Sequence, residues 1–203
     1  MTNAMLLPIV LTLLLSAFTS LQLVSAVDIV FWSGSTCDGV GAGCVNIAAG
    51  RCCRYDPNRP SVEFKYSASC KGVKAYGGTN SGCGTQIGSA SGSGCFTGGY
   101  FSGGKWVNNS CRRRQLLTSK VAGIESEQCI GSSAQCTGYV KPNALFYREP
   151  STEGLWILNK KNATGLFEQL ASLPAPARRA WLKSHGASHQ SETEQMKIFT
   201  VEN

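Results

Sequence analysis

Cysteine is the residue type with the most chemistry to offer here, and the chain of 203 residues contains ten of them. Cysteine thiols can pair as disulfides, ligate a metal or attack a substrate. Zinc sites favour C-x-x-C pairs with a second pair or histidines nearby, but no C-x-x-C occurs here and both histidines lie near the C-terminus. We therefore expect no metal site and no thiol catalysis, and the even number of cysteines fits five disulfides. The ten are Cys37, Cys44, Cys52, Cys53, Cys70, Cys83, Cys95, Cys111, Cys129 and Cys136.

Two of these cysteines, Cys52 and Cys53, are adjacent in the chain. Neighbouring side chains on an extended chain point to opposite faces of a sheet. We therefore expect their sulfur atoms to bond to different partners, in preference to a strained vicinal bridge. A bridge between Cys129 and Cys136 would leave the other eight to pair among themselves, and the sequence alone does not choose the connectivity.

Other catalytic groups are sparse. A serine or cysteine nucleophile needs a base within hydrogen-bond reach, and no histidine occurs before His185. Glycoside hydrolysis needs two carboxyl groups that flank the scissile bond, and Asp38, in a glycine-containing loop, is the first residue to test. No glycine-rich stretch is followed by the lysine and helix of a phosphate-binding loop. We predict a protein without a cofactor that does not act as a catalyst, and keep a small secreted polysaccharide hydrolase as an alternative.

An apolar run at residues 5–24 precedes every charged side chain of the sequence. It is followed by Val24-Ser25-Ala26, which places small or short side chains at the −3 and −1 positions of a signal-peptidase site. We predict a signal peptide over residues 1–26 and a secreted, extracellular mature protein. A retained membrane anchor is the alternative, because the run is long enough to span a bilayer. Secretion also provides the oxidising compartment that paired cysteines require.

Short strands must position the cysteines, because the stretch from Cys37 to Cys111 is too rich in glycine for long helices. Strand signals recur along it with glycine turns between them, which predicts a mainly β fold, a small disulfide-rich antiparallel sandwich or Greek key. The predicted strands are Asp28–Trp32, Cys44–Ile47, Val62–Tyr66, Val73–Tyr76 and Lys105–Val107, with shorter extended pieces at Cys95–Phe96 and Tyr100–Phe101.

Period-two alternation is clearest at Val62–Tyr66. There we expect a half-buried antiparallel strand whose polar face carries Glu63 and Lys65. Prolines and Asx residues predict a turn or loop at Asp56–Pro60. The small, polar run Ser89–Gly94 is also expected to be a loop, because it offers nothing large to pack.

Composition changes after Cys111, and we divide the chain on that basis. Thr164 is expected to cap a first helix near the C-terminus, and Pro176 to open a second. We expect these helices to dock loosely on the β-domain, and the polar tail from Ala187 to be disordered. The predicted segments are a signal peptide (1–26), a disulfide-rich β-domain (27–111), an extension of that domain with Cys129 and Cys136 (112–140), and a C-terminal extension with short helices (141–203).

The residues from Phe31 to Cys53 follow a recognisable order. Phe31-Trp32-Ser33-Gly34 is followed by Cys37-Asp38-Gly39, then by Cys44-Val45-Asn46-Ile47 and Gly50-Arg51-Cys52-Cys53. This arrangement resembles small secreted cysteine-rich proteins of fungi, some of which resemble the βγ-crystallin-like fold of killer toxins and antifungal proteins. The resemblance covers residues 27–111 and implies a secreted binding or toxic module. The paired calcium loop of that superfamily is not evident in this sequence, so calcium binding is not implied.

The net charge of +7 favours anionic surfaces only modestly, and the basic side chains are not interleaved with aromatic residues as nucleic-acid binding requires. We predict a protein that acts by binding at a surface, as an effector, toxin-like or antimicrobial protein. Its expected partner is a glycan, a membrane surface or a host protein, and not a nucleic acid. A structural protein of the cell wall or matrix is the alternative.

Two sets of surface residues follow from this interpretation. N-glycosylation is expected at the sequons of Asn108 and Asn162. Aromatic and basic side chains along the predicted strands are the candidates for contact with the partner. They are Trp32, Tyr76, Tyr100, Trp106, Lys71, Lys74 and Lys105.

Overall fold

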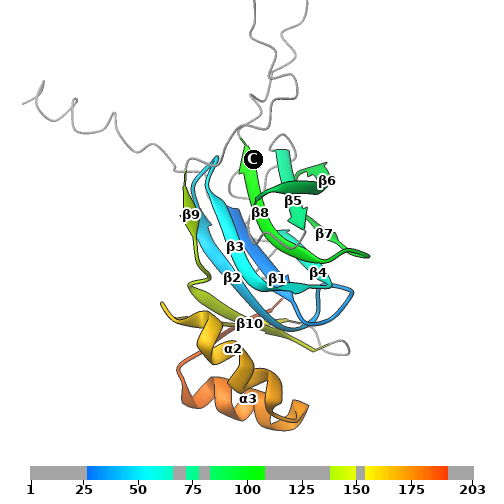
Figure 1. Ribbon diagram of the computed structural model, residues 1–203. Helices are drawn as coiled ribbons and strands as arrows, with labels where there is room; N and C mark the ends of the chain where they lie inside the picture. The colour runs from blue at the N-terminus through cyan, green and yellow to red at the C-terminus, as the bar shows by residue number, and fades with distance from the viewer. Residues whose placement is uncertain (1–26, 66–71, 78–82, 108–137, 150–153, 192–203) are drawn as a thin grey trace, which may run out of the picture.

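The computed structural model describes residues 27–65, 72–77, 83–107, 138–149 and 154–191. These residues form two β-sheets packed face to face, with two helices at one end (Figure 1). The predicted small, disulfide-rich β-sandwich is therefore confirmed. The strands are β1 (Val27–Trp32), β2 (Gly39–Ile47), β3 (Cys52–Arg59), β4 (Ser61–Lys65), β5 (Gly72–Gly77), β6 (Thr85–Ser91), β7 (Gly94–Phe96), β8 (Phe101–Val107), β9 (Tyr139–Val140), β10 (Ala144–Arg148), β11 (Leu155–Asn159) and β12 (Ser188–Gln190); the helices are α2 (Ala163–Ser172) and α3 (Ala175–Ser184).

The larger sheet has seven strands in the order β12-β11-β10-β2-β1-β4-β7, and the smaller has five in the order β6-β5-β8-β3-β9. Nearly all neighbouring strands run antiparallel, as predicted. The pair β3 and β9 is parallel. This one parallel pair arises because β9 returns to the smaller sheet from a distant part of the sequence.

β1 lies inside the larger sheet, between β2 and β4, and all six of its residues are buried. Its β-branched and aromatic side chains suit a pleated strand that is covered on both faces. Ile29 and Phe31 belong to the main core, whereas Val30 and Trp32 belong to a second apolar cluster on the opposite face. Both faces of this strand are therefore covered.

β4 departs from the half-buried strand that its alternation predicts. Its polar face is not open to solvent: Lys65 is only 6% exposed, and Glu63 is mostly buried. The reason is a partner that lies far away in the sequence. Arg148 of β10 forms an ion pair with Glu63 at 3.1 Å, and Glu63 also accepts a hydrogen bond from the Trp32 indole at 3.1 Å. Charged side chains can be buried when they are paired in this way.

Two stretches that we expected to be loops consist mostly of strand residues. The first is Asp56–Pro60, where β3 continues to Arg59 with a register shift after Arg54 against β8. A bulge accommodates the proline, which lacks the N–H of a regular ladder. The second is Ser89–Gly94, where the chain completes β6, turns at Gly92 with φ of +80° and enters β7. Its small side chains stay exposed, because backbone pairing holds an edge strand without large packing groups.

The C-terminal segment completes the larger sheet. β10 pairs with β2, and β11 pairs with β10. Leu145 and Tyr147 face the main core, whereas Phe146 packs in the second cluster. The tail from Ala187 was expected to be disordered, but it provides β12, which pairs with β11 at the edge of the sheet.

The helices are packed more closely than we expected. Phe167 and Leu170 of α2 are fully buried in the main core, so this helix is not loosely docked. Its N-cap is Asn162, whose side chain accepts a hydrogen bond from the backbone of the first turn, and not Thr164. Pro176 lies in the first turn of α3, as predicted. Proline suits that position because the first N–H groups of a helix have no partner within it.

Three disulfides hold the described part of the sandwich. Cys52 and Cys53 bond to different partners, as predicted. One bridge joins the two sheets through β2 and β3, and each of the other two joins a loop cysteine, Cys37 or Cys83, to a strand. The bridges are Cys37–Cys95, Cys44–Cys53 and Cys52–Cys83. The other cysteines, Cys70, Cys111, Cys129 and Cys136, lie outside the described residues.

Disulfides in this number are typical of extracellular proteins. The predicted signal peptide lies outside the described residues. Within the described part of the chain, no helix has the length and apolar character needed to cross a membrane.

Candidate ligand pocket

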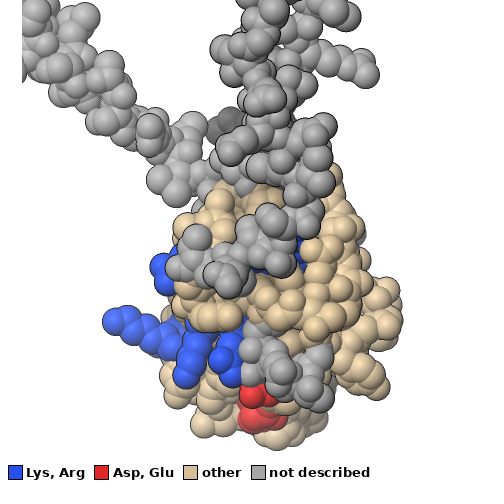
Figure 2. Space-filling view, turned by 45° about the horizontal axis from the view of Figure 1, so that its top comes forward, with Lys and Arg blue, Asp and Glu red and all other residues tan. Residues whose placement is uncertain are grey.

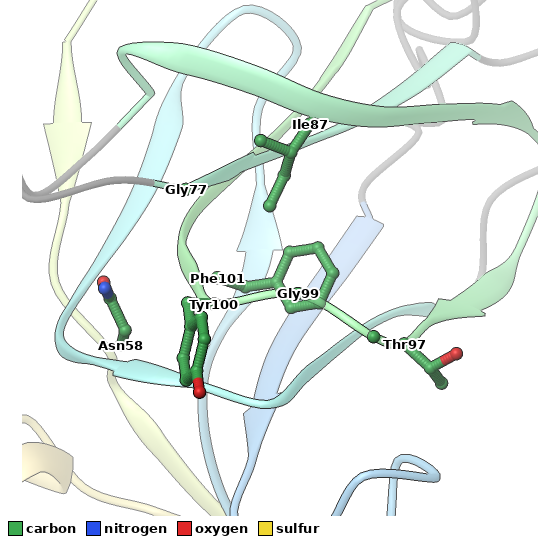
Figure 3. A pocket seen from close by; sticks show the side chains of 8 residues that line it. Asn58, Gly77, Ile87, Thr97, Gly99, Tyr100 and Phe101 are labelled. Atoms are coloured by element: carbon green, nitrogen blue, oxygen red, sulfur yellow. The ribbon is translucent and has the colours of Figure 1, made fainter.

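An open pocket of about 530 Å³ lies at one end of the smaller sheet. It is bounded by the bulge of β3, the end of β5, the middle of β6 and the turn that joins β7 to β8. In Figure 3, Ile87 reaches into it from β6, and Tyr100 and Phe101 enter from the start of β8. Its described lining consists of Asn58, Gly77, Ile87, Thr97, Gly98, Gly99, Tyr100 and Phe101.

Glycine at two positions allows the backbone to form this pocket. Gly98 has φ of +75°, a conformation that other residues rarely adopt, and it turns the chain between β7 and β8. Gly77 lies against the backbone of Tyr100, where an added Cβ atom would come within 2.4 Å of the Tyr100 carbonyl oxygen. A side chain at Gly77 would therefore push the turn, and the tyrosine that it carries, out of place.

The pocket is lined mainly by apolar groups that face solvent. Large exposed apolar side chains in the described residues are few, and two of the three, Ile87 at 47% and Tyr100 at 75%, line this pocket. Phe101 is 3% exposed and lies beneath them in the core. Asn58 and Thr97 supply an amide and a hydroxyl at the sides. An apolar surface with a few polar groups at its margin is typical of sites that bind small ligands.

The described residues that line the pocket carry no charge. No acidic, basic or histidine residue occurs between Ala75 and Gly104 in the sequence. Figure 2 shows the same separation on the molecular face in view, where Lys and Arg side chains gather to one side and the side on which β6 and β7 lie carries none. A ligand of this pocket would therefore gain little from a charge.

A buried charged cluster on the second apolar face of the larger sheet contrasts with this pocket. Glu63 lies 3.1 Å from Arg148 and 3.9 Å from Lys65. Burial raises the pKa of Asp28 to about 6, although a hydrogen bond from the Asn46 backbone and the nearby Lys65 oppose that shift. Burial also lowers the pKa of the Lys65 ammonium. These groups pair with one another inside the protein, so we assign the cluster a structural role.

Comparison with known families adds one finding. Residues 28–143 match the ARB_05566_N family, which is described as an N-terminal domain. The chain belongs to this family. A search of curated proteins found no match, and no solved structure matched either.

The ARB_05566_N match covers the first part of the sandwich and leaves out its last strands and helices. It includes every described residue that lines the pocket and all three disulfides. It ends at Asn143, directly before β10. The strands and helices that follow complete the same sandwich from outside the matched region.

Of the predicted contact residues, the structure brings Tyr100 alone into the pocket. Trp32, Trp106 and Tyr76 are buried, with exposures of 0%, 2% and 5%, so their prediction as surface contacts is wrong. The Trp106 indole donates a hydrogen bond to the Ile47 carbonyl at 2.6 Å, which fixes it in the core.

The predicted lysines do not reach the pocket. Lys105 is 3% exposed, and its ammonium lies 5.5 Å from the centre of the Tyr76 ring, so this prediction is also wrong. Lys74 is partly exposed on β5 and does not line the pocket. Lys71 lies outside the described residues.

The remaining predicted site residues are Asp38 and the two glycosylation sites. The Asp38 carboxylate accepts a hydrogen bond from the Thr36 hydroxyl at 3.0 Å and so takes part in its own turn. Asn162 is exposed at the start of α2, where a glycan would not disturb the core. Asn108 lies outside the described residues. Among the described side chains, no group of three or more His, Cys, Asp or Glu residues is placed to hold a metal ion.

Sequence reasoning missed Ile87, Asn58 and Thr97. Ile87 and Thr97 could have been found because both lie in a long uncharged stretch of the sequence, where Ile87 is a large apolar residue among glycines and serines. Asn58 carried no such signal, because only the bulge in β3 brings it to the pocket.

Proposed function

We propose that this protein is a secreted, cysteine-rich effector, toxin-like or antimicrobial protein that acts by binding a neutral glycan through the pocket around Tyr100. Secretion is supported by the apolar run and cleavage motif at residues 1–26 and by the three disulfides. The resemblance to fungal secreted cysteine-rich proteins agrees with a binding role. Catalysis is not part of the proposal.

One observation carries the proposal: exposed apolar groups are concentrated at one uncharged pocket. Single exposed apolar residues are ordinary on a protein surface, but a contiguous group marks a contact site. Ile87 and Tyr100 are such a group, and the chain holds them in place with glycines and with the tightly packed Phe101.

The chemistry of the lining favours a saccharide. A pyranose ring has a face of C–H groups and a rim of hydroxyls. The first suits the Tyr100 ring and Ile87, and the second suits the Asn58 amide and the Thr97 hydroxyl, which can both donate and accept hydrogen bonds. The absence of charge between Ala75 and Gly104 favours a neutral sugar over an acidic one.

Binding of soluble oligosaccharides from chitin, β-glucan and mannan, measured by isothermal titration calorimetry, tests this proposal. We expect Tyr100→Ala to weaken binding about tenfold, or about 1.4 kcal/mol, because a central aromatic contact is lost. Tyr139→Ala is the matched control, since Tyr139 is 60% exposed but lies on β9, away from the pocket. It should leave the affinity unchanged.

Three results would overturn the proposal. In the first, none of the oligosaccharides binds. In the second, the two tyrosine variants weaken binding equally. In the third, neutral phosphatidylcholine vesicles bind in place of sugars and Tyr100→Ala abolishes that binding, which would make the ligand a lipid.

A further inference from the structure

A second pocket, of about 310 Å³, is formed by residues that follow those of the glycan pocket in the sequence. It is formed by α3 together with the ends of β10, β11 and β12, so it lies wholly outside the residues that match the ARB_05566_N family. Its chemistry differs from that of the first pocket because charged side chains line it. The described lining consists of Tyr147, Glu149, Gly154, Trp156, Arg179, Lys183 and His189.

Basic side chains surround an aromatic wall in this pocket. The Lys183 ammonium lies 5.6 Å from the centre of the Trp156 ring, and the His189 ring centre lies 4.8 Å from it. The Lys183 contact is a cation–π interaction, which holds the ammonium in place beside the ring without neutralising its charge. Lys183 and His189 are both exposed, so they can reach a ligand from solvent.

The pocket already holds one oxyanion, the carboxylate of Glu149. This carboxylate forms an ion pair with Arg179 and accepts a hydrogen bond from the Tyr147 hydroxyl at 3.2 Å. The Glu149 side chain is 17% exposed, whereas Arg179 is 46% exposed. The guanidinium can therefore bind a second, external oxyanion with the donors that face solvent, since it presents five N–H groups in a planar fork.

We propose that this pocket binds an oxyanion, a phosphate or carboxylate group of a small ligand, through Arg179 and Lys183. Glu149 acts as an internal competitor that lowers the affinity until a ligand displaces it from part of Arg179. This site is independent of the proposed glycan site, because the two pockets share no described lining residue.

Inorganic phosphate is the first probe, and glucuronate is the second, for a carboxylate on a sugar. Their binding is followed by the NMR signal of the Trp156 indole N–H, assigned with Trp156→Phe. We expect saturable shifts, and a loss of affinity of about fivefold in Lys183→Gln and in Arg179→Gln, because each removes a charge-assisted hydrogen bond. Glu149→Gln should tighten binding about threefold, because it removes the competing charge.

Lys161→Gln is the matched control: it removes an exposed charge just before α2, outside the pocket. It should leave phosphate affinity unchanged. The proposal is overturned if the Trp156 signal does not saturate, if Lys161→Gln weakens binding as much as Lys183→Gln, or if Glu149→Gln weakens it. Thermal unfolding of each variant shows whether it is folded, and the opposite signs for Glu149→Gln and Lys183→Gln distinguish binding from a general loss of structure.

Discussion

The segment from Cys83 to Tyr100, which carries β6 and β7, and the region from β10 to α3 are held together by different means. In the first, β6 is exposed along nearly its whole length, and bridges anchor the segment at Cys83, just before β6, and at Cys95 in β7. The second contains no cysteine. Its strands and helices instead bury large side chains, among them Leu145, Phe146 and Phe167.

This difference explains where each region can carry a ligand site. Covalent bridges restrict the unfolded chain, so the bridged region needs less apolar burial to stay folded. Ile87 and Tyr100 can therefore remain at the surface. The unbridged region depends on burial of its apolar side chains, and what it leaves exposed around its pocket is mainly charged. The two pockets accordingly differ in chemistry.

The largest loss of stability should follow from removal of a core aromatic side chain in the unbridged region. Phe167 is 1% exposed and packs edge-on against Tyr55 at 5.9 Å, with the Arg59 guanidinium 4.0 Å from its ring centre. Phe167→Ala should lower the free energy of unfolding by about 4 kcal/mol, because it leaves a cavity in the main core. Urea denaturation of the oxidised protein measures this loss. A loss below about 1 kcal/mol would mean that packing is not what holds this region.

Removal of one bridge should have a smaller effect, centred on the other region. Cys37–Cys95 spans 58 residues, so its loss frees a long loop in the unfolded chain. The double variant Cys37→Ser/Cys95→Ser should lose about 3 kcal/mol. Hydrogen exchange should rise first in β7 and β4, while α2 remains protected.

Combining these substitutions sharpens the comparison. If the regions are held independently, the losses from Phe167→Ala and from Cys37→Ser/Cys95→Ser should add to within about 0.5 kcal/mol. A larger coupling would show that both regions depend on the same interactions, and the comparison would fail.

Several strands and the pairing rule for the cysteines could be predicted from local sequence. β1 was recognisable because β-branched and aromatic residues follow one another from Asp28 to Trp32. The separate partners of Cys52 and Cys53 followed from strand geometry alone. Both features depend on neighbours in the chain, which the sequence displays directly.

The exposure of individual side chains could not be predicted in the same way. Glu63 looked like a surface residue because its partner, Arg148, lies 85 residues away. Trp106 and Tyr100 are both aromatic residues near glycines, and only the paths of distant strands place one in the core and the other at the pocket. Alternation shows which side chains share a face, but it does not show what covers that face.

The smallest change that we predict in the free energy of unfolding concerns β1, the strand that joins the two regions through β2 and β4. Because burial raises the pKa of Asp28 from 3.8 to about 6, its carboxyl binds a proton more tightly in the folded chain than in the unfolded one. The free energy of unfolding should therefore fall by about 2 kcal/mol as the pH rises from 3.8 to about 6, and should level off as the pH rises further and the folded-state carboxyl loses its proton completely.

Asp28→Asn tests this explanation because the amide oxygen can still accept the hydrogen bond from the Asn46 backbone. Urea denaturation between pH 3.5 and pH 7 should then lose the part of the slope that Asp28 contributes, and the variant should be more stable than the parent at neutral pH. A parent protein that gains stability from pH 4 to pH 6, with the same gain in Asp28→Asn, would show that other carboxyl groups dominate. A variant less stable at neutral pH would show that the attraction between Asp28 and Lys65 outweighs the cost of burying the charge, and that β1 is held by its ion pairs as well as by its apolar faces.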